Sequence, residues 1–287
     1  MSWVRLFDSF KCIAVPLRPV CLCSLFALLT FLCGAALAAG GSPDWRKVHS
    51  DMEVAQVGIA SNDIFTPELA LVRTSLKSFR LEVLRASDFG YKRSDAKTLC
   101  SESKATLCIN ANFFDEDGKA LGLVVSRGIM HQKIHAGGAL LNGILQASRR
   151  RVSVVDRRQF DRSSVVEAVQ AGPRLIENGL AIKNLPNNTN KSRRAGACVD
   201  KQGRLIFFCS SSSLGGLTIE RLQTVLLSKG IECHEALNLD GGGSAQMFLG
   251  QVSGVKRSPE QDQDRPIFDL PGGDEVPVVL ALILNGQ

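Results

Sequence analysis

One acidic residue directly precedes three glycines and a hydroxyl side chain in the stretch Asn238–Met247, NLDGGGSAQM. The short run before it, Glu235–Leu239, is typical of a buried strand and would place the Asp240 carboxylate at a strand end. Glycines leave backbone N–H groups uncovered, so an anionic or sugar-like ligand can approach Gly241–Gly243 closely. We therefore take Asp240 as the candidate catalytic residue. The alternative is a tight turn in which Asp240 only satisfies its own loop.

The composition is that of a globular protein without a nucleic-acid-binding surface. The chain has 287 residues, of which 45% are hydrophobic and 22% charged, enough for a sizeable core. The net charge of +6 is a mild excess, and basic clusters such as Arg149–Arg151 are typical of a solvated face. One Tyr and two Trp provide no aromatic residues interleaved with the basic ones, so we expect no nucleic acid partner.

The N-terminal 39 residues predict a targeting segment. Arg5, Lys11 and Arg18 precede the uncharged run Val20–Ala39, which contains the small-residue pattern Ala36-Leu-Ala38 that signal peptidases recognise. A run of about twenty apolar residues is also long enough to span a bilayer as an uncleaved anchor. Either way, we expect the rest of the chain to be exported to the periplasm. Membrane contact would be limited to the N-terminal segment.

Cysteine and histidine spacing predicts neither a metal site nor another cofactor. Outside the targeting segment the cysteines are Cys100, Cys108, Cys198, Cys209 and Cys233. Their odd number requires at least one free thiol or an intermolecular bridge. Cys100 and Cys108 are close enough in sequence to bridge, and Cys198 and Cys209 flank a predicted hairpin, so the pairing stays open. No Cys-x-x-Cys occurs, and the glycines near His131 and His135 argue against a shared helix face.

Short strands outnumber helices along the rest of the chain, which predicts a single α+β domain with a strand-rich mixed sheet and a few helices. We expect 1–39 to be the signal peptide or signal anchor, 40–50 a lead-in and 51–287 the domain. Helices are predicted over Ser94–Lys104 and from the capping residue Thr218 to Gly230. The predicted strands are Val54–Ala60, Phe79–Arg85, Thr106–Asn110, Leu121–Val125, Gly138–Leu145, Val152–Val155, Val165–Ala171, Ala195–Asp200, Leu205–Cys209 and Val276–Leu284.

Four blocks, in this order, resemble the phosphodiester glycosidase family over roughly residues 105–285. They are Asn110-Ala-Asn-Phe-Phe-Asp115 with Gly122 and Gly128, Ala168–Pro173 with Asn178-Gly179, Arg193–Ala197, and Gly215–Phe248. The departures are Asn112, where the family has a small residue, and Arg194 and Ala197 in the arginine block. The cysteine-rich and membrane-spanning regions of the animal enzyme do not follow here. The chain therefore resembles a bacterial exported relative.

The resemblance implies hydrolysis of a sugar-1-phosphodiester, such as an N-acetylglucosamine-1-phosphodiester, at the anomeric C–O bond. The departing phosphate monoester is a weak base, so its protonation is less demanding than in an ordinary glycoside. Asp240 would activate water or stabilise positive charge, Arg193 would hold the phosphate, and Asn110 would hold a sugar hydroxyl or acetamido group. The further substrate-binding candidates are Arg174, Arg194, Asn238, Gly241, Gly242, Gly243 and Ser244.

Several alternatives remain open at this point. Asn110 and Asn238 could instead stitch loops through side-chain-to-backbone bonds, and Arg174 could be a surface residue after a Gly-Pro turn. Ordinary glycosidases need a second carboxylate, and Glu177, Asp200 and Asp269 are equally available. Two other functions compete with hydrolysis at the C–O bond. One is a non-catalytic binding module for envelope phospho-sugars, and the other is a phosphodiesterase that cuts P–O.

Overall fold

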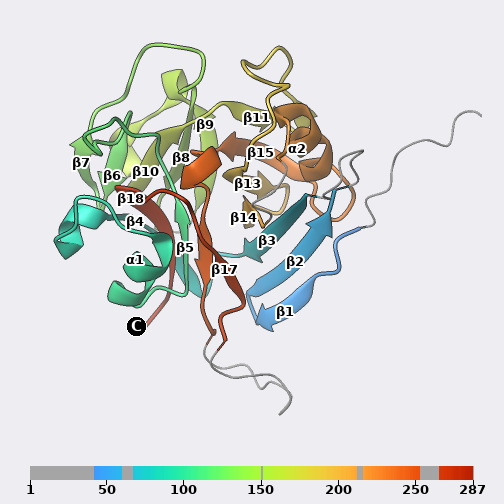
Figure 1. The fold of residues 1–287 in the computed structure, drawn as a ribbon, viewed down its shortest axis with the longest axis horizontal. Helices are drawn as coiled ribbons and strands as arrows, with labels where there is room; N and C mark the ends of the chain where they lie inside the picture. Colours follow the sequence, from blue (N-terminus) through green and yellow to red (C-terminus); the bar gives the residue numbers. More distant parts are fainter. Residues whose placement is uncertain (1–41, 60–66, 150, 212–215, 253–264, 287) are drawn as a thin grey trace, which may run out of the picture. The chain divides into compact units, whose positions relative to one another are not determined.

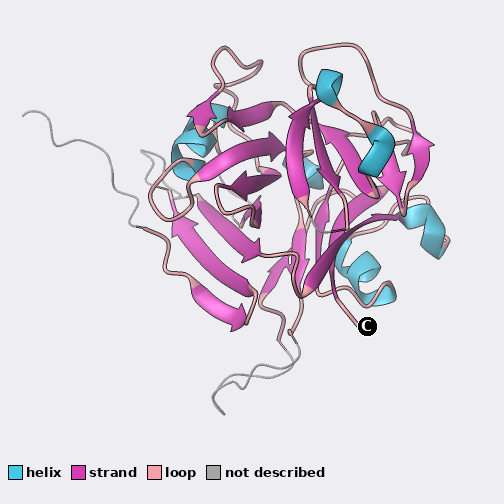
Figure 2. Ribbon diagram, turned by 180° about the vertical axis from the view of Figure 1, so that it is seen from behind, coloured by secondary structure: helices cyan, strands magenta, loops and turns pink. Residues whose placement is uncertain are grey.

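The computed structural model describes residues 42–59, 67–149, 151–211, 216–252 and 265–286. The predicted targeting segment, residues 1–39, lies outside these ranges. Strands make up most of the regular secondary structure of the described chain (Figure 1; Figure 2). Within the described ranges, no helix has both the length and the apolar character needed to cross a membrane. Residues Ala39–Gln287 form one compact unit.

The largest sheet has eight strands and carries the arginine block, part of the Gly215–Phe248 block and the Asn178-Gly179 turn of the family resemblance. Its spatial order is β1 (Arg46–His49), β2 (Met52–Gly58), β3 (Glu68–Thr74), β14 (Leu205–Ser210), β13 (Ala195–Asp200), β15 (Cys233–Asn238), β11 (Arg174–Glu177) and β12 (Leu180–Ala181). Strand β1 begins inside the segment that we expected as a lead-in.

Two five-stranded sheets complete the fold. One has the order β7 (Ile129–Gln132), β6 (Val124–Ser126), β10 (Glu167–Ala171), β8 (Gly143–Ala147) and β9 (Val152–Asp156). The other has the order β17 (Phe268–Leu270), β16 (Met247–Leu249), β5 (Leu107–Asn110), β18 (Val278–Leu284) and β4 (Phe79–Arg85).

The three sheets share one hydrophobic core because alternate side chains of each sheet point to it. Val72 of β3, Leu145 of β8 and Leu280 of β18 all belong to this core cluster. The two-residue period of a strand sends the neighbouring side chains to the opposite face. In the central strands β13 and β14 every residue is buried, because the second face of the eight-stranded sheet is also covered.

Among the described residues, helix α2 (Ile219–Leu226) covers this second face of the large sheet, and helix α1 (Ala96–Glu102) covers the outer face of another sheet. Helix α2 packs Leu222 and Leu226 against Ile206 and Phe208 of β14, and Figure 1 shows it beside β11 and β15. Its N-terminus is capped by the Thr218 hydroxyl, which accepts the Arg221 N–H at 3.2 Å, as the sequence predicted. Helix α1, capped by Asp95, covers the outer face of the β4–β18–β5 sheet. Short 3₁₀ turns lie at Ala86–Phe89, Arg157–Gln159, Arg162–Ser164 and Gly242–Ser244.

The expected strand-rich chain with few helices is confirmed, but the α+β class fits only loosely. The strands form three sheets in place of one, and each pair among the described strands is antiparallel. Strand β3 was not predicted, and β8 begins at Gly143, five residues after the predicted start. Helix α2 ends at Leu226, before Gly230.

One disulfide joins two neighbouring strands of the large sheet, Cys198 of β13 and Cys233 of β15. The Cys198–Cys209 pair, which the sequence left open, does not form. Strand alternation sends Cys209 to the shared core and Cys198 to the face under α2, so the two thiols lie on opposite sides of the sheet. Cys100 and Cys108 are free, buried and within hydrogen-bonding contact of each other.

Candidate active site

The ends of several strands from different sheets meet at Asp240. The Asp240 N–H donates to the Ala111 carbonyl at 3.1 Å, just after β5 ends. The preceding residue, Leu239, donates to the Ala195 carbonyl at 2.9 Å, where β13 begins. Asp240 therefore follows strand β15 directly, as the sequence predicted, and is held between elements from two sheets.

The Asp240 carboxyl lies in an environment that makes it harder to ionise. Burial raises its pKa to about 6 from an ordinary 3.8, and the nearby Asp274 carboxylate adds to the rise. A hydrogen bond from Ser244 and one from the Gly241 N–H at 2.9 Å oppose the rise by stabilising the ionised form. Asp240 is thus half protonated near pH 6, a property shared by many catalytic carboxyl groups.

The three glycines pack tightly, and their N–H groups are mostly used within the protein. The Gly241 N–H donates to Asp240 itself, and the Gly242 N–H donates to the Arg193 carbonyl at 3.0 Å. Among the described contacts, the exposed Gly243 is the glycine whose N–H is left for a ligand. A Cβ on Gly241 would lie 2.8 Å from the Arg193 carbonyl oxygen, which explains why a glycine stands there. The sequence-based expectation of an anion cradle therefore rests mainly on Gly243.

A second carboxylate, Asp274, lies beside the glycine loop. The Gly273 and Asp274 N–H groups both donate to the Gly243 carbonyl, at 2.7 and 3.1 Å. A Cβ built on Gly243 would come within 2.1 Å of Asp274 Oδ2, so the glycine makes room for this carboxylate. Asp274 was not among the sequence candidates. Its only signal was a position after two glycines in a polar segment.

The three carboxylates that the sequence left available are held in ion pairs. Glu177 accepts from Arg174 at 2.7 Å, Asp200 from Arg204 at 2.6 Å and Asp269 from Lys97 at 2.8 Å. None of them is among the groups that perturb the Asp240 pKa. Asp274 is therefore the better candidate for the second carboxylate.

Arg193 and Arg194 point in different directions because they are consecutive residues entering β13. Arg193 Nη2 donates to the Pro271 carbonyl at 2.9 Å, next to the Asp274 loop, and its buried Nε has no hydrogen-bond partner. Arg194 is buried and donates to the Leu217 and Asn190 carbonyls at 2.9 and 2.6 Å. Burial lowers the pKa of Arg194. The arrangement therefore favours Arg193 for contact with substrate and Arg194 for support of the loop before β13.

Arg174 is engaged away from Asp240. Its guanidinium donates to Glu177 at 2.7 Å and to the buried Asp156 at 3.3 Å. The hydrogen bond from Arg158 lowers the Asp156 pKa, and burial raises it. The hydrogen bond has the larger effect, and the Asp156 pKa is about 2. Because two carboxylates already neutralise its positive charge, Arg174 is a poor candidate for binding an anionic substrate.

Both candidate asparagines act as internal ties. Asn110 is fully buried, donates to the Asp240 carbonyl at 2.7 Å and accepts the Gln246 N–H at 3.0 Å. Asn238 donates to the Gly172 and Leu239 carbonyls at 3.1 and 2.6 Å, while its buried Oδ1 has no partner. Loop stitching, the alternative noted for both, matches these contacts. Asn110 fixes the Asp240 backbone and is a positioning residue.

Two further buried glutamines tie loops together and were missed, and one of them, Gln246, holds the site. Gln246 accepts the Ala96 N–H at 2.6 Å and donates to the Asp274 carbonyl at 2.9 Å, so it ties α1 to the second carboxylate. Gln170 bonds the backbone of Leu123, His135 and Leu141. Its neighbour Asn112, noted above as a departure from the family, donates to the Gln170 carbonyl at 2.9 Å. Gln246, Gln170 and Asn112 all lie inside blocks that carry the family resemblance. That position is the sequence signal that could have identified them.

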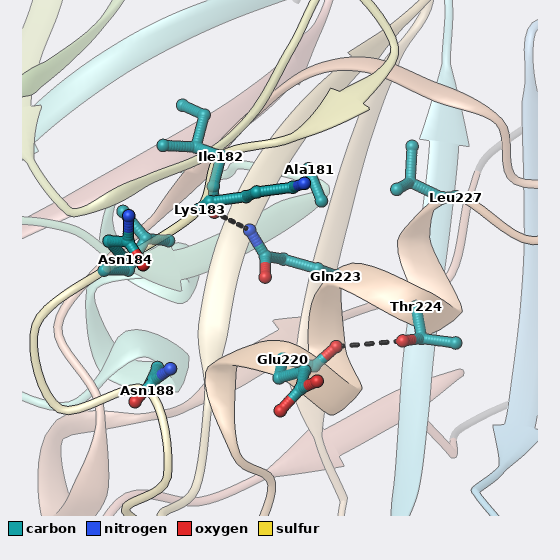
Figure 3. A pocket seen from close by; sticks show the side chains of 10 residues that line it. Ala181, Ile182, Lys183, Asn184, Asn188, Glu220, Gln223, Thr224 and Leu227 are labelled. Carbon is teal, nitrogen blue, oxygen red and sulfur yellow. Dashed lines mark hydrogen bonds between the residues drawn. The ribbon is translucent and has the colours of Figure 1, made fainter.

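The larger of the cavities described lies elsewhere. A cavity of about 440 Å³ opens between α2 and the segment after β12, lined by Lys183, Asn188 and Gln223 among others (Figure 3). The Gln223 amide already donates to the Leu175 and Ile182 carbonyls, at 2.7 and 2.8 Å. None of the sequence-predicted site residues lines this cavity. We therefore place the candidate active site at Asp240 and Asp274.

Within the described ranges, no group of three or more His, Cys, Asp or Glu residues is placed to hold a metal ion.

The family model for phosphodiester glycosidases matches residues 103–270, which is more than half of the chain. The match includes Asp240, Arg193 and Asn110 and ends just before Asp274. No curated protein matches the chain in sequence.

Three solved structures share the fold. A hypothetical protein from Synechocystis has a TM-score of 0.62 and 13% identity over 85% of this chain, which spans 64% of that protein. The zebrafish N-acetylglucosamine-1-phosphodiester alpha-N-acetylglucosaminidase catalytic domain, auto-inhibited by its pro-peptide, has a TM-score of 0.60 and 19% identity over 84% of this chain and 87% of that domain. A Burkholderia pseudomallei protein described as exported has a TM-score of 0.53 and 12% identity over 76% of this chain and 74% of that protein.

Proposed function

This chain belongs to the phosphodiester glycosidase family, and we propose that it hydrolyses a sugar-1-phosphodiester at the anomeric C–O bond. The observation that carries the proposal is the pair of carboxylates, Asp240 and Asp274, beside Arg193 where the strands meet. Two carboxylates flanking the reacting bond are what glycoside hydrolysis requires. An arginine next to them suits a substrate whose leaving group is a phosphate.

In the proposed mechanism, water adds to the anomeric carbon and the C–O bond to the phosphate breaks. The electron pair of that bond departs on the phosphate oxygen, and the water proton passes to the Asp240 carboxylate. Arg193 binds the phosphate oxygens through its guanidinium, which offsets the charge that develops as the bond breaks. The negative charge of Asp274 stabilises the oxocarbenium-like centre and makes Asp240 a stronger base.

N-acetylglucosamine is the sugar that we propose for the reacting side. The zebrafish relative carries this specificity in its name, and the family match supports a related substrate. The test uses N-acetylglucosamine-1-phosphate esterified to a reporter alcohol, with products identified by mass spectrometry. We expect free N-acetylglucosamine and the phosphorylated alcohol. Release of N-acetylglucosamine-1-phosphate and free alcohol would show that the other ester bond is cut and would contradict the proposal.

The pH dependence of the reaction is expected to follow Asp240. Since the active form is the ionised carboxylate and its pKa is about 6, kcat/KM should fall as the pH drops below about 6. Asp274→Asn removes a like charge that raises this pKa, so the acid limb should move to lower pH. A pH–rate profile of kcat/KM measures both. An acid limb that stays in place in Asp274→Asn, or moves to higher pH, would show that Asp274 does not act on Asp240.

We also propose that the domain is exported to the periplasm, either freed by cleavage after the targeting segment or anchored by residues 20–39. The basic residues before the uncharged run support export, as does the Cys198–Cys233 disulfide, because such bonds persist in oxidising compartments. The relative from Burkholderia pseudomallei is described as exported. When the full-length sequence is expressed, release by osmotic shock of a protein that lacks the targeting segment would support the cleaved form. Recovery with the cytoplasmic fraction would contradict export.

A further inference from the structure

A second cavity opens beside Val278, whose carbonyl accepts the Ala111 N–H. It has a volume of about 240 Å³ and is lined by Arg85 of β4, Val124 of β6, His131 of β7 and Val278 of β18, together with Lys92 and Lys119 from loops. We call it the basic cavity. Its floor is apolar, with Ala120 and Pro277 beside Val124 and Val278. It thus combines a surface for a sugar ring or carbon chain with a cationic rim.

The charge around the basic cavity is one-sided. Arg85, Lys92 and Lys119 line it, and no carboxylate does. Asp88 pairs with Arg85, which leaves the two lysines to supply most of the free positive charge. The nearby acidic turn Asp115–Asp117 does not line the cavity, and Asp115 accepts the Lys119 backbone N–H at 2.8 Å. An anion is the ligand that would offset the charge of two ammonium groups at one cavity.

Two backbone hydrogen bonds lie between Asp240 and a residue that lines the basic cavity. Asp240 N–H donates to the Ala111 carbonyl at 3.1 Å, and the Ala111 N–H donates to the Val278 carbonyl at 3.2 Å. Val278 lines the cavity. Two hydrogen-bonded backbone spacings amount to roughly 10 Å. From the anomeric carbon, a carboxylate on a sugar beyond the phosphate can extend about this far.

We propose that the basic cavity binds an anionic group on the alcohol side of the phosphodiester, so that the preferred leaving group is the phosphate of an acidic sugar. This inference rests on the proposed function, since it assigns the part of the substrate that lies beyond the phosphate. Lys92 and Lys119 contact the anion, and the apolar floor contacts the ring that carries it. Arg193 remains the residue that holds the phosphate itself.

The kinetic test compares two substrates that differ by one carboxylate. N-acetylglucosamine-1-phosphate is esterified to glucose in one and to glucuronic acid in the other. Wild-type protein is expected to prefer the glucuronate ester, and Lys92→Gln/Lys119→Gln should lower kcat/KM for that ester about tenfold while leaving the glucose ester unchanged. The matched control is Lys47→Gln/Lys201→Gln, which removes two exposed cations outside the cavity and should leave the preference intact.

A binding test does not depend on turnover. His131 lines the cavity. Burial lowers its pKa most, the charge of Arg85 lowers the pKa further, and the charge of Asp88 acts in the opposite direction. Titration with inorganic phosphate, followed by NMR of the imidazole, should therefore raise the His131 pKa in wild type but not in the double-lysine variant. An unchanged His131 and equal kcat/KM for both esters would overturn the proposal. A His131 response without sugar release from either ester would contradict the proposed function and keep the anion site.

Discussion

Replacing Asp240 with asparagine is expected to lower kcat by about 10²- to 10⁴-fold while substrate affinity is kept or increased. Asparagine has nearly the same shape and can still accept the Gly241 N–H that Asp240 accepts at 2.9 Å. It cannot take a proton from water. Binding should not weaken, because the change removes a negative charge next to an anionic phosphodiester. Steady-state kinetics and calorimetric titration of the variant with substrate measure the two effects separately.

Asp269→Asn is the matched control for this change. Asp269 lies on β17, on the surface, and pairs with Lys97, so its replacement alters the same chemical group outside the site. It should leave kcat and affinity close to those of wild type. If Asp240→Asn kept full turnover, Asp240 would not be the catalytic base. If it abolished binding together with turnover, the residue would serve recognition, as in the binding-module alternative.

Removal of the Cys198–Cys233 disulfide is expected to cost about 4 kcal/mol in the free energy of unfolding. The bond closes a loop of sequence separation 35, and the entropy lost by the unfolded chain on closing such a loop has this magnitude. It also joins β13 and β15. Arg193 lies just before β13, and Asp240 lies just after β15. The Cys198→Ala/Cys233→Ala variant should lose roughly 10 °C in Tm, measured by calorimetry.

Reduction of the native protein serves as the control for the packing change that alanine introduces. Reductant should lower the Tm of wild type by a similar amount and leave the double-alanine variant unaffected. The free thiols Cys100, Cys108 and Cys209 are buried in both proteins and do not distinguish them. Equal stability of oxidised and reduced wild type would contradict a structural role for the disulfide.

The position of Asp240 was predictable because its signal is local. A short apolar run followed by an acid and glycines specifies a strand end, and β15 ends where that pattern indicates. Helix α2 begins at a capping threonine for the same reason. Asp274 was not predictable in this way. It reaches the site because two N–H groups of its loop bond the Gly243 carbonyl, a contact between segments that no local pattern encodes.

The roles of the polar residues depend on the packing of whole elements. Asn110 is the last residue of a predicted strand. Only the approach of β16 and of the Asp240 loop shows that backbone groups bond both ends of its side-chain amide. The two-residue period of β13 decides between Arg193 and Arg194, once the covered faces of the sheet are known. The same alternation excludes the Cys198–Cys209 pair. The spacing of these residues in the sequence predicts neither which arginine faces the site nor which cysteines pair.

The central claim is that water attacks the anomeric carbon, and hydrolysis in ¹⁸O-labelled water tests it most directly. The purified protein is incubated with an N-acetylglucosamine-1-phosphodiester in labelled water, and mass spectrometry locates the label in the products, allowing for solvent exchange at the anomeric carbon of free sugar. Cleavage of the C–O bond leaves the phosphorylated alcohol unlabelled, with the heavy oxygen on the sugar. A labelled phosphate group would show that P–O is cut instead and would contradict the mechanism built on Asp240, Asp274 and Arg193.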